Sequence, residues 1–384
     1  MNLGRSRRKL AAVHLTQAEQ PGGVVAKRTT RQRRTVRVIV MRFVLLLIFW
    51  WAASVPFIGA TEPTVNVTVI SHFDRPWSMT AEDLAAFEHL TANHPNMRWT
   101  HLYNPVAYTQ ETPLRDEMER FVKQSRANHD AEIGVHLHMY KSLLDAAGVE
   151  FVPQPSLAAD AVEGSYDESG YAVPMTRYSR DEIGRMLTFT LKTFHDRELG
   201  EPKTFCAGFY ATSLDLQREI AARGFTTSAA AFPPGTQFGS EYAPSWHALS
   251  GWDASVMYRT VPYRVSQSTI LPHGQQPFLL AADHKPLVEL PQTCKIDWMV
   301  TDEDMKVIFK EHLAIARGGN TTAVCLAIHE TGGAAYVAKY DEVLAYIDEH
   351  IASRSKPNVR YVTAAELREL VVAASVPDER LREQ

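Results

Sequence analysis

Stretches of apolar and β-branched residues alternate along the chain with stretches in which apolar positions recur at helical spacing. This alternation is typical of parallel strands that are covered by helices. Strands are predicted at 65–71, 97–103, 132–140, 204–210, 226–232, 286–293, 322–330 and 359–364. Helices are predicted at 80–91, 113–129, 179–197, 213–223, 301–317, 335–352 and 364–374.

Some helix boundaries carry sequence signals. Thr80 precedes a predicted helix and Asp83 follows three residues later, which is the spacing of a capping box. Pro113 stands where a first-turn proline is tolerated, and Gly224 follows a predicted helix end. These signals support the predicted boundaries.

Two long stretches, 148–178 and 233–280, interrupt the alternation and are rich in Pro, Gly, Ser and aromatic residues. Loops of this length inside a compact domain usually form functional walls or lids. The pieces together predict one domain over 61–384, an α/β fold in which about seven to eight parallel strands form an irregular (β/α) barrel. Its site is expected at the carboxyl ends of the strands.

The N-terminal sixty residues follow another pattern. Lys and Arg are frequent over 5–37, and an uncharged run covers 43–60. A cationic flank, then about 7–15 apolar residues, then small residues is the layout of a secretory signal, whereas a spanning helix needs about 20 apolar residues. Pro56 interrupts the run near that length. A cleaved signal within 41–60 is therefore favoured over a retained anchor.

Signal and anchor both predict an exported domain, either periplasmic or secreted, that touches the inner membrane only through an uncleaved 41–60 segment. Met41 followed by Arg42 favours a translation start at Met41, which would leave 1–40 outside the protein. The alternative is a genuine basic cytoplasmic tail, whose composition offers no packed core.

Composition narrows the class of protein. Hydrophobic residues make up 45% and charged residues 22% of the chain, which is ordinary for a globular domain. The net charge is −4 although the first forty residues are strongly basic, so the remaining domain is acidic. This balance gives no reason to expect a nucleic-acid partner.

Polar residues cluster at the predicted strand ends. His136 and His138 share one face of a strand because side chains at i and i+2 point the same way. With Asp74 after the first strand, they offer donors suited to a divalent metal ion such as zinc. A lone histidine is more often a core residue, but the pair with an aspartate favours metal binding. Glu289 and His329 occupy equivalent places on later strands.

Five segments resemble motifs of the polysaccharide deacetylase (NodB-like) superfamily, over about residues 65–370. The segments are SHFDRPW (71–77), EIGVHLHMY (132–140), TFCAGFYATSLDLQREIAARGFTTSAA (204–230), LAIHE (326–330) and VRYVTAAEL (359–367). The resemblance implies a deformed barrel that binds one divalent metal through an aspartate and two histidines, with a separate aspartate as base. It also implies a late histidine as the acid that protonates the leaving amine, which is His329 here.

The chain departs from the family pattern at three positions. Arg75 stands where the family has its metal aspartate, Tyr140 where it has its second histidine, and Cys206 where it has an arginine. Asp74 matches the family's base, so the ligand set that remains is Asp74, His136 and His138. Either Asp74 is chiefly a ligand and Glu289 or Glu330 assists proton transfer, or the activity is altered or lost.

Glu289 lies inside an otherwise apolar stretch, where a carboxyl more often needs a buried partner than serves in proton transfer. Aromatic residues near the predicted site and the long insertion offer flat faces for sugars, although packing explains most such residues. The candidates for substrate binding are Tyr140, Tyr210, Trp252 and Trp298.

The sequence therefore predicts a metal-dependent hydrolase that removes N-acetyl groups from an envelope or extracellular polysaccharide, for example peptidoglycan. One alternative is a carbohydrate-binding barrel that has lost catalysis, and Arg75 and Tyr140 argue for it. A glycosidase is the third interpretation, and it needs two carboxylates that face one bond. Asp74, Glu289 and Glu330 are the only candidates for that pair.

Overall fold

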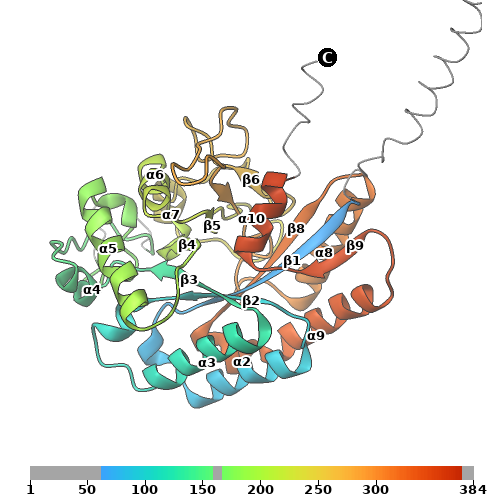
Figure 1. Cartoon of the computed structure of the whole chain (residues 1–384), viewed down its shortest axis with the longest axis horizontal. Helices are drawn as coiled ribbons and strands as arrows, with labels where there is room; N and C mark the ends of the chain where they lie inside the picture. Colours follow the sequence, from blue (N-terminus) through green and yellow to red (C-terminus); the bar gives the residue numbers. More distant parts are fainter. Residues whose placement is uncertain (1–61, 159–166, 374–384) are drawn as a thin grey trace, which may run out of the picture. The chain divides into compact units, whose positions relative to one another are not determined.

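One sheet organises the computed structural model, which describes residues 62–158 and 167–373 (Figure 1). Its strand order is β6-β7-β5-β4-β3-β2-β1-β8, and β9 pairs with the first half of β1. All pairings are parallel except that of β6 with β7. The strands are β1 (Thr64–His72), β2 (Trp99–Tyr103), β3 (Glu132–Leu137), β4 (Thr204–Ala207), β5 (Thr227–Ser228), β6 (Tyr263–Arg264), β7 (Val288–Glu289), β8 (Thr322–His329) and β9 (Asn358–Tyr361).

The sheet curls without closing. Strands β6 and β8 lie at the two ends of the order, and no pairing joins them in the described parts of the chain. The prediction of a single-domain, irregular parallel (β/α) barrel is confirmed. The antiparallel β6 was not predicted, because it is two residues long and lies inside the 233–280 stretch.

Helices cover the outside of the sheet, and α2 packs along α9 (Figure 1). Most match the predicted ranges within a few residues, although the helix predicted from Pro113 begins at Arg115. The helices are α2 (Ala81–Asn93), α3 (Arg115–His129), α4 (Lys141–Ala146), α5 (Arg180–Asp196), α6 (Leu214–Ala222), α7 (Pro244–Leu249), α8 (Asp302–Arg317), α9 (Gly333–Ala352) and α10 (Ala364–Ala373). Single 3-10 turns occur at Pro76–Ser78, Pro105–Tyr108, Met175–Arg177, Gly208–Tyr210 and Glu330–Gly332.

The capping box predicted at Thr80 is confirmed. The Asp83 amide donates to Thr80 Oγ1 at 3.1 Å, and the Thr80 amide donates to Asp83 Oδ2 at 3.0 Å. The same reciprocal bonds open α5 at Ser179 and α8 at Thr301. Each box satisfies helix donors that would otherwise lack partners, so these sequences fix where the helices begin.

The central strands are buried on both faces. Every residue of β1 and of β2 is buried, as expected for parallel strands covered by helices. Because β1 pairs with β8 in register from Val65 to His72, the ends of these strands meet as His72 beside His329. The carboxyl edge of the sheet therefore gathers the polar residues that follow the strands.

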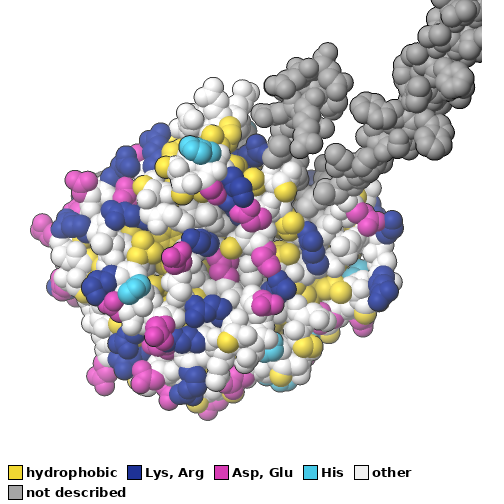
Figure 2. Space-filling model, viewed as in Figure 1, with side chains coloured by type: hydrophobic (Ala, Val, Ile, Leu, Met, Phe, Trp, Pro, Cys, Tyr) yellow, Lys and Arg dark blue, Asp and Glu magenta, His cyan; other side chains and the backbone are white. Residues whose placement is uncertain are grey.

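The surface of the described domain carries mixed charges, and its helices are not of the membrane-spanning kind. Figure 2 shows Lys and Arg interspersed with Asp and Glu over the visible face. No helix within 62–158 or 167–373 combines the length and apolar character needed to cross a bilayer. The signal or anchor predicted at 41–60 and the tail 1–40 lie outside the described residues.

Candidate metal centre

A cavity of about 250 Å³ lies at the carboxyl edge of the sheet. The ends of β3 and β8 contribute to it, as do the loops after β1, β4, β5 and β7 and the stretch 167–178. Its lining consists of Asp74, Arg75, His136, Tyr171, Phe209, Tyr210, Tyr242, Ile296, Trp298 and His329. The cavity thus contains residues from parts of the sequence more than 200 positions apart.

Three predicted ligands converge beside this cavity. His136 Nε2 lies 2.7 Å from Asp74 Oδ1, and His138 Nε2 lies 3.3 Å from Asp74 Oδ2. The two Nε2 atoms are 3.1 Å apart. All three side chains are at least nine-tenths buried. Strand β3 ends at Leu137, so His136 is the strand's penultimate residue and His138 begins the following loop.

The other ring nitrogens determine the tautomers. His136 Nδ1 lies 3.0 Å from the carbonyl oxygen of Cys206, and His138 Nδ1 lies 2.6 Å from that of Tyr171. A carbonyl oxygen only accepts, so Nδ1 carries the hydrogen in both rings. In the neutral rings each Nε2 then presents a lone pair. Two lone pairs that face each other at 3.1 Å beside a carboxylate repel each other unless a positive charge lies between them, either a metal ion or a proton on one of the rings.

The donor set fits a divalent metal ion. Zinc–nitrogen and zinc–oxygen bonds of about 2.0–2.2 Å place tetrahedral ligands about 3.3 Å apart, close to the observed separations. Asp74 Oδ1 is buried and faces His136 Nε2 at 2.7 Å. Burial alone would raise the pKa of Asp74, but His329, His138 and His136 hold it well below the usual range. The carboxylate therefore remains ionised, as a ligand must be.

A second donor group shares His136. His72, His136 and Cys206 also lie close enough to surround an ion. Burial raises the pKa of the Cys206 thiol well above its usual value, and the acids nearest to it raise the pKa further. A thiol ligand must lose its proton, so this group is the weaker candidate.

His329 completes the site on the side of β8. Its Nδ1 lies 3.1 Å from Asp297 Oδ1, and its backbone amide donates to Asp297 Oδ2 at 2.7 Å. Its Nε2 is 3.5 Å from Asp74 Oδ2. Burial would lower the pKa of His329, but the Asp297 and Asp74 carboxylates raise it to about 10. His329 is therefore held protonated, with Nε2 available to the cavity.

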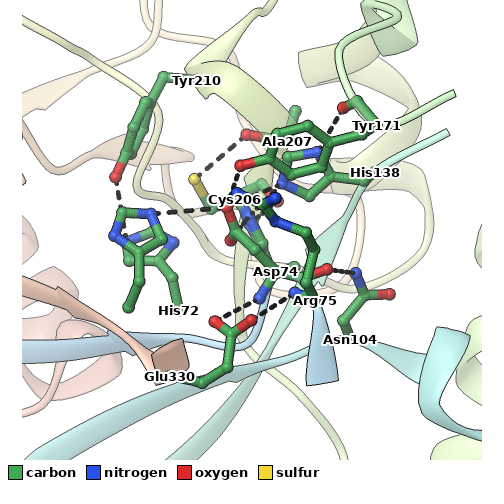
Figure 3. Close-up of polar contacts among 12 residues, drawn as sticks. His72, Asp74, Arg75, Asn104, His138, Tyr171, Cys206, Ala207, Tyr210 and Glu330 are labelled. Atoms are coloured by element: carbon green, nitrogen blue, oxygen red, sulfur yellow. Dashed lines mark hydrogen bonds and ion pairs between the residues drawn. The ribbon is translucent and has the colours of Figure 1, made fainter. Parts of the chain in front are cut away.

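Glu330 fixes the backbone of Asp74 and Arg75, just after β1. Its Oε2 accepts from the Asp74 amide at 2.8 Å, and its Oε1 accepts from the Arg75 amide (Figure 3). Glu330 is fully buried and does not line the cavity. Both of its oxygens are engaged, so it positions Asp74 rather than taking part in proton transfer.

Gly208 makes room for the second histidine. A Cβ atom at Gly208 would stand 2.5 Å from His138 Nδ1 and 2.7 Å from its Cγ. The next two residues, Phe209 and Tyr210, have left-handed backbone with φ of 53° and 59°. Such backbone is costly for aromatic residues and is retained where a structure needs it. This turn brings Tyr210 into the cavity.

We expect Gly208→Ala to lower the affinity for zinc by roughly 10- to 100-fold, because displacing His138 resembles the loss of a residue that orients a ligand. Zinc titration with a competing chelator measures the change. Gly235→Ala is the matched control, since a Cβ atom there meets nothing within 4 Å. Unchanged affinity in Gly208→Ala would contradict the assignment of His138 as a ligand.

Glu289, a predicted catalytic residue, is placed elsewhere by the structure. Its Oε1 accepts from the amides of Ala230 and Ala231, each at 2.7 Å, and its Oε2 accepts from Gln217 Nε2 at 3.0 Å. It is fully buried and does not line the cavity. These bonds tie β7 to the end of β5, so the carboxyl serves the fold and has no contact with the candidate metal centre.

Glu289 also makes stability depend on pH. Burial raises its pKa from 4.5 to about 7, against the lowering effect of its hydrogen bonds. Between these values the folded chain holds a proton that the unfolded chain has released. The free energy of unfolding therefore falls as pH rises, by about 1.4 kcal/mol per unit from this group.

We expect Glu289→Gln to remove that slope between about pH 4.5 and about pH 7. The side-chain amide of the introduced glutamine would still find a partner. Gln217 Oε1 has no hydrogen-bond partner in the described structure, and it can accept from the new amide if the Gln217 side chain flips. Urea unfolding at several pH values measures the slope. An unaltered slope in Glu289→Gln would show that another group causes it.

The predicted substrate-binding aromatics divide into two pairs. Tyr210 and Trp298 line the cavity, and Trp298 is 51% exposed. Trp252 is buried and donates from Nε1 to the Tyr210 carbonyl at 2.7 Å, so it supports the turn that carries Tyr210. Tyr140 is buried and does not line the cavity. Of the four candidates, Tyr210 and Trp298 are therefore the ones placed at the cavity.

Two residues that hydrogen-bond to the ionisable groups of the site were not predicted. Asp297 orients His329, and its only sequence signal is an acid beside Trp298 shortly after a predicted strand. Tyr171 donates to Asp74 Oδ2 at 3.1 Å and accepts from His138 through its carbonyl. It lies in the 148–178 stretch, for which only a functional wall or lid was predicted.

No protein-family model and no curated protein matches the sequence. Similar solved structures include a candidate glycoside hydrolase/deacetylase from Parabacteroides distasonis, with 12% identity, coverage of 81% of this chain and 72% of that chain, and a TM-score of 0.50. A candidate polysaccharide deacetylase from Mycobacterium smegmatis has 14% identity, coverage of 84% and 94%, and a TM-score of 0.48. A family 4 carbohydrate esterase from Streptomyces lividans has 12% identity, coverage of 74% of this chain and 89% of that chain, and a TM-score of 0.33.

At these identities the similarity establishes the fold. The Parabacteroides structure supports it at a TM-score of 0.50. The resemblance to the deacetylase barrel that the sequence motifs indicated is confirmed at that level.

Proposed function

We propose that this chain is a metal-dependent hydrolase that removes acyl groups from the nitrogen of amino sugars in an exported polysaccharide. One observation carries the proposal. Two imidazole lone pairs and an ionised carboxylate converge on one point, next to a protonated histidine, in a cavity at the carboxyl edge of a deacetylase-like barrel. That set of groups matches the needs of amide hydrolysis.

Asp74, His136 and His138 would hold the ion. A divalent metal held there would supply Lewis-acid polarisation of the acyl carbonyl and of a water molecule, and positive charge for the developing oxyanion. The chain itself supplies fixed orientation: backbone carbonyls hold both imidazoles, and Glu330 holds the backbone of Asp74.

Proton transfer uses the opposite side of Asp74. Because Glu289 and Glu330 are engaged elsewhere, Asp74 would have to serve as both ligand and base: its Oδ1 faces the metal site, and its Oδ2, which accepts from the Tyr171 hydroxyl, would take the proton that the attacking water loses. His329 Nε2 gives a proton to the leaving nitrogen as the carbon–nitrogen bond breaks. The proton then returns from Asp74 to His329 across the 3.5 Å that separates Oδ2 from Nε2. The cycle is balanced and ends with free amine and carboxylic acid.

Aromatic faces give the cavity a site for sugar rings. Trp298 is half exposed at its rim, and its ring centre lies 6.2 Å from that of Tyr242. Tyr210 closes another wall. Rings of this kind stack on the apolar faces of sugars, which suits a polysaccharide substrate.

Acetate release tests the proposal. We expect the zinc-loaded protein to release acetate from chito-oligosaccharides or peptidoglycan fragments, to lose this activity after chelation, and to regain it when a divalent metal is returned. No acetate release from either type of substrate with any of zinc, cobalt or manganese would favour the carbohydrate-binding alternative.

A glycosidase is less well supported. It needs two carboxylates that face one glycosidic bond. Asp74 is the only carboxylate among the described residues that line the cavity. Glu289 and Glu330 are both engaged by backbone amides away from it.

We also propose that the domain acts outside the cytoplasm. The support is the apolar run over 43–60 behind a basic flank. N-terminal sequencing of the mature protein tests this proposal, and a start just after the small residues 59–60, or after those at 52–54, is the expected result for a cleaved signal.

A further inference from the structure

Arg75 is a charged cavity residue that the hydrolytic mechanism does not use. It is exposed and lines the cavity beside Asp74. Its Cζ atom lies 4.5 Å from the ring centre of Tyr171. Within 62–158 and 167–373, no side chain or carbonyl accepts a hydrogen bond or an ion pair from its guanidinium. Its donors therefore face the cavity without a protein partner.

Arg75 is held both at its backbone and at the end of its side chain. The Arg75 amide donates to the buried carboxylate of Glu330, and the side chain extends from there toward Tyr171 (Figure 3). The Tyr171 ring is itself fixed, because its hydroxyl donates to Asp74 and its carbonyl accepts from His138. An arginine that is already ordered loses little conformational freedom when it binds an anion.

The charge of the cavity also favours an anion. Asp74 is the one acidic side chain among the described lining residues, and Arg75 balances it. A bound divalent ion would make the cavity clearly positive. The planar fork of a guanidinium matches the two oxygens of a carboxylate better than it matches a neutral hydroxyl or acetamide group.

We propose that Arg75 binds a carboxylate that the substrate carries on the same sugar unit as the hydrolysed amide, so that the preferred substrate is an acidic acylated amino sugar. This inference rests on the proposed function and narrows its substrate class. The carboxylate has two chemical sources, the sugar ring or the acyl group. Neutral chito-oligosaccharides should then be hydrolysed more slowly than acidic substrates.

Calorimetric binding at pH 7 with two matched pairs of ligands tests the proposal. The first pair is an N-acetylated hexosaminuronic acid and its methyl ester, and the second is N-succinylglucosamine and its methyl ester. We expect the acid of one pair to bind roughly 10- to 100-fold more tightly than its ester. The pair that shows this preference identifies the source of the carboxylate.

Variants link the preference to the side chain. In Arg75→Gln the acid-to-ester ratio should fall to about one, and Arg75→Lys should retain part of it because it keeps the charge without the fork. Arg120→Gln is the matched control, since it removes an exposed arginine of α3 that does not line the cavity. Its ratio should equal that of the unmodified protein.

Two outcomes would overturn the inference: equal affinity for acid and ester in both pairs, or a preference that survives in Arg75→Gln. The proposed hydrolase activity is tested independently of the role of Arg75. Acetate release without any preference for acids leaves the hydrolase standing and removes the role of Arg75. A preference that Arg75→Gln abolishes, in a protein that hydrolyses none of the four compounds, supports the role of Arg75 and removes the hydrolase.

Discussion

His136→Ala and His138→Ala are each expected to abolish stoichiometric zinc binding and to lower acyl hydrolysis by roughly 10³-fold or more. Each change removes one of the two imidazole Nε2 atoms, 3.1 Å apart, that face the Asp74 carboxylate. Zinc should raise the melting temperature of the unmodified protein, because a ligand at about 1,000 times its Kd stabilises the fold by about 4 kcal/mol. Neither variant should show this increase.

Metal analysis after dialysis and thermal melts with and without zinc measure both effects. His195→Ala is the control, because His195 is an exposed residue of α5 outside the cavity. Circular dichroism separates a lost site from a lost fold. If either ligand variant keeps one zinc per chain with unchanged affinity, the site has been assigned to the wrong residues.

His329→Gln is expected to lower kcat by about 10²- to 10⁴-fold while the metal content stays at one per chain, because the variant loses the acid and keeps the ligands. Asp297→Asn tests how the neighbouring carboxylate affects the pKa of His329. The carboxylates of Asp297 and Asp74 raise the pKa of His329 to about 10, despite burial. Without the Asp297 charge, the pKa of His329 falls.

The sign of the pH effect follows from the role of the group. An acid works only while protonated, so activity declines as pH rises through the pKa of His329. The alkaline limb of kcat/KM should therefore move to lower pH in Asp297→Asn. Asp348→Asn is the matched control, since Asp348 lies 2.6 Å from the ring of another histidine, His94, outside the cavity. An alkaline limb that does not move in Asp297→Asn would mean that another group limits activity at high pH.

The sequence was most informative where structure is local. Capping boxes act over three residues, so Thr80 and Asp83 could be identified directly. The i, i+2 spacing of His136 and His138 predicted that their rings would share a face, and both Nε2 atoms do meet beside Asp74. Alternating strand and helix patterns sufficed for the barrel.

Contacts between distant loops could not be predicted in this way. Asp297 meets His329 across 32 positions, and Tyr171 meets Asp74 across 97. Both pairs form through irregular backbone, where no periodicity sets the direction of a side chain. Glu289 shows the opposite problem: its strand pattern implied an inward-facing carboxyl, but only the fold shows that two amides occupy it.

The same limit applies to the aromatic residues. Trp252 lies within the long stretch 233–280 and Trp298 follows it, and composition cannot separate their roles. In the fold one supports the turn at Tyr210, and the other is half exposed at the cavity. Whether an aromatic side chain packs in the interior or can touch a substrate depends on how deeply it is buried, and burial depends on the fold of the whole domain.

We propose that Asp74, His136 and His138 bind one divalent metal ion. A crystal structure of the zinc-soaked protein, with anomalous diffraction recorded on both sides of the zinc absorption edge, tests it most directly. We predict one strong peak about 2.0–2.2 Å from an Asp74 oxygen and from both Nε2 atoms. A fully soaked crystal with no peak at this point, or with its only peak at other residues, would contradict the claim.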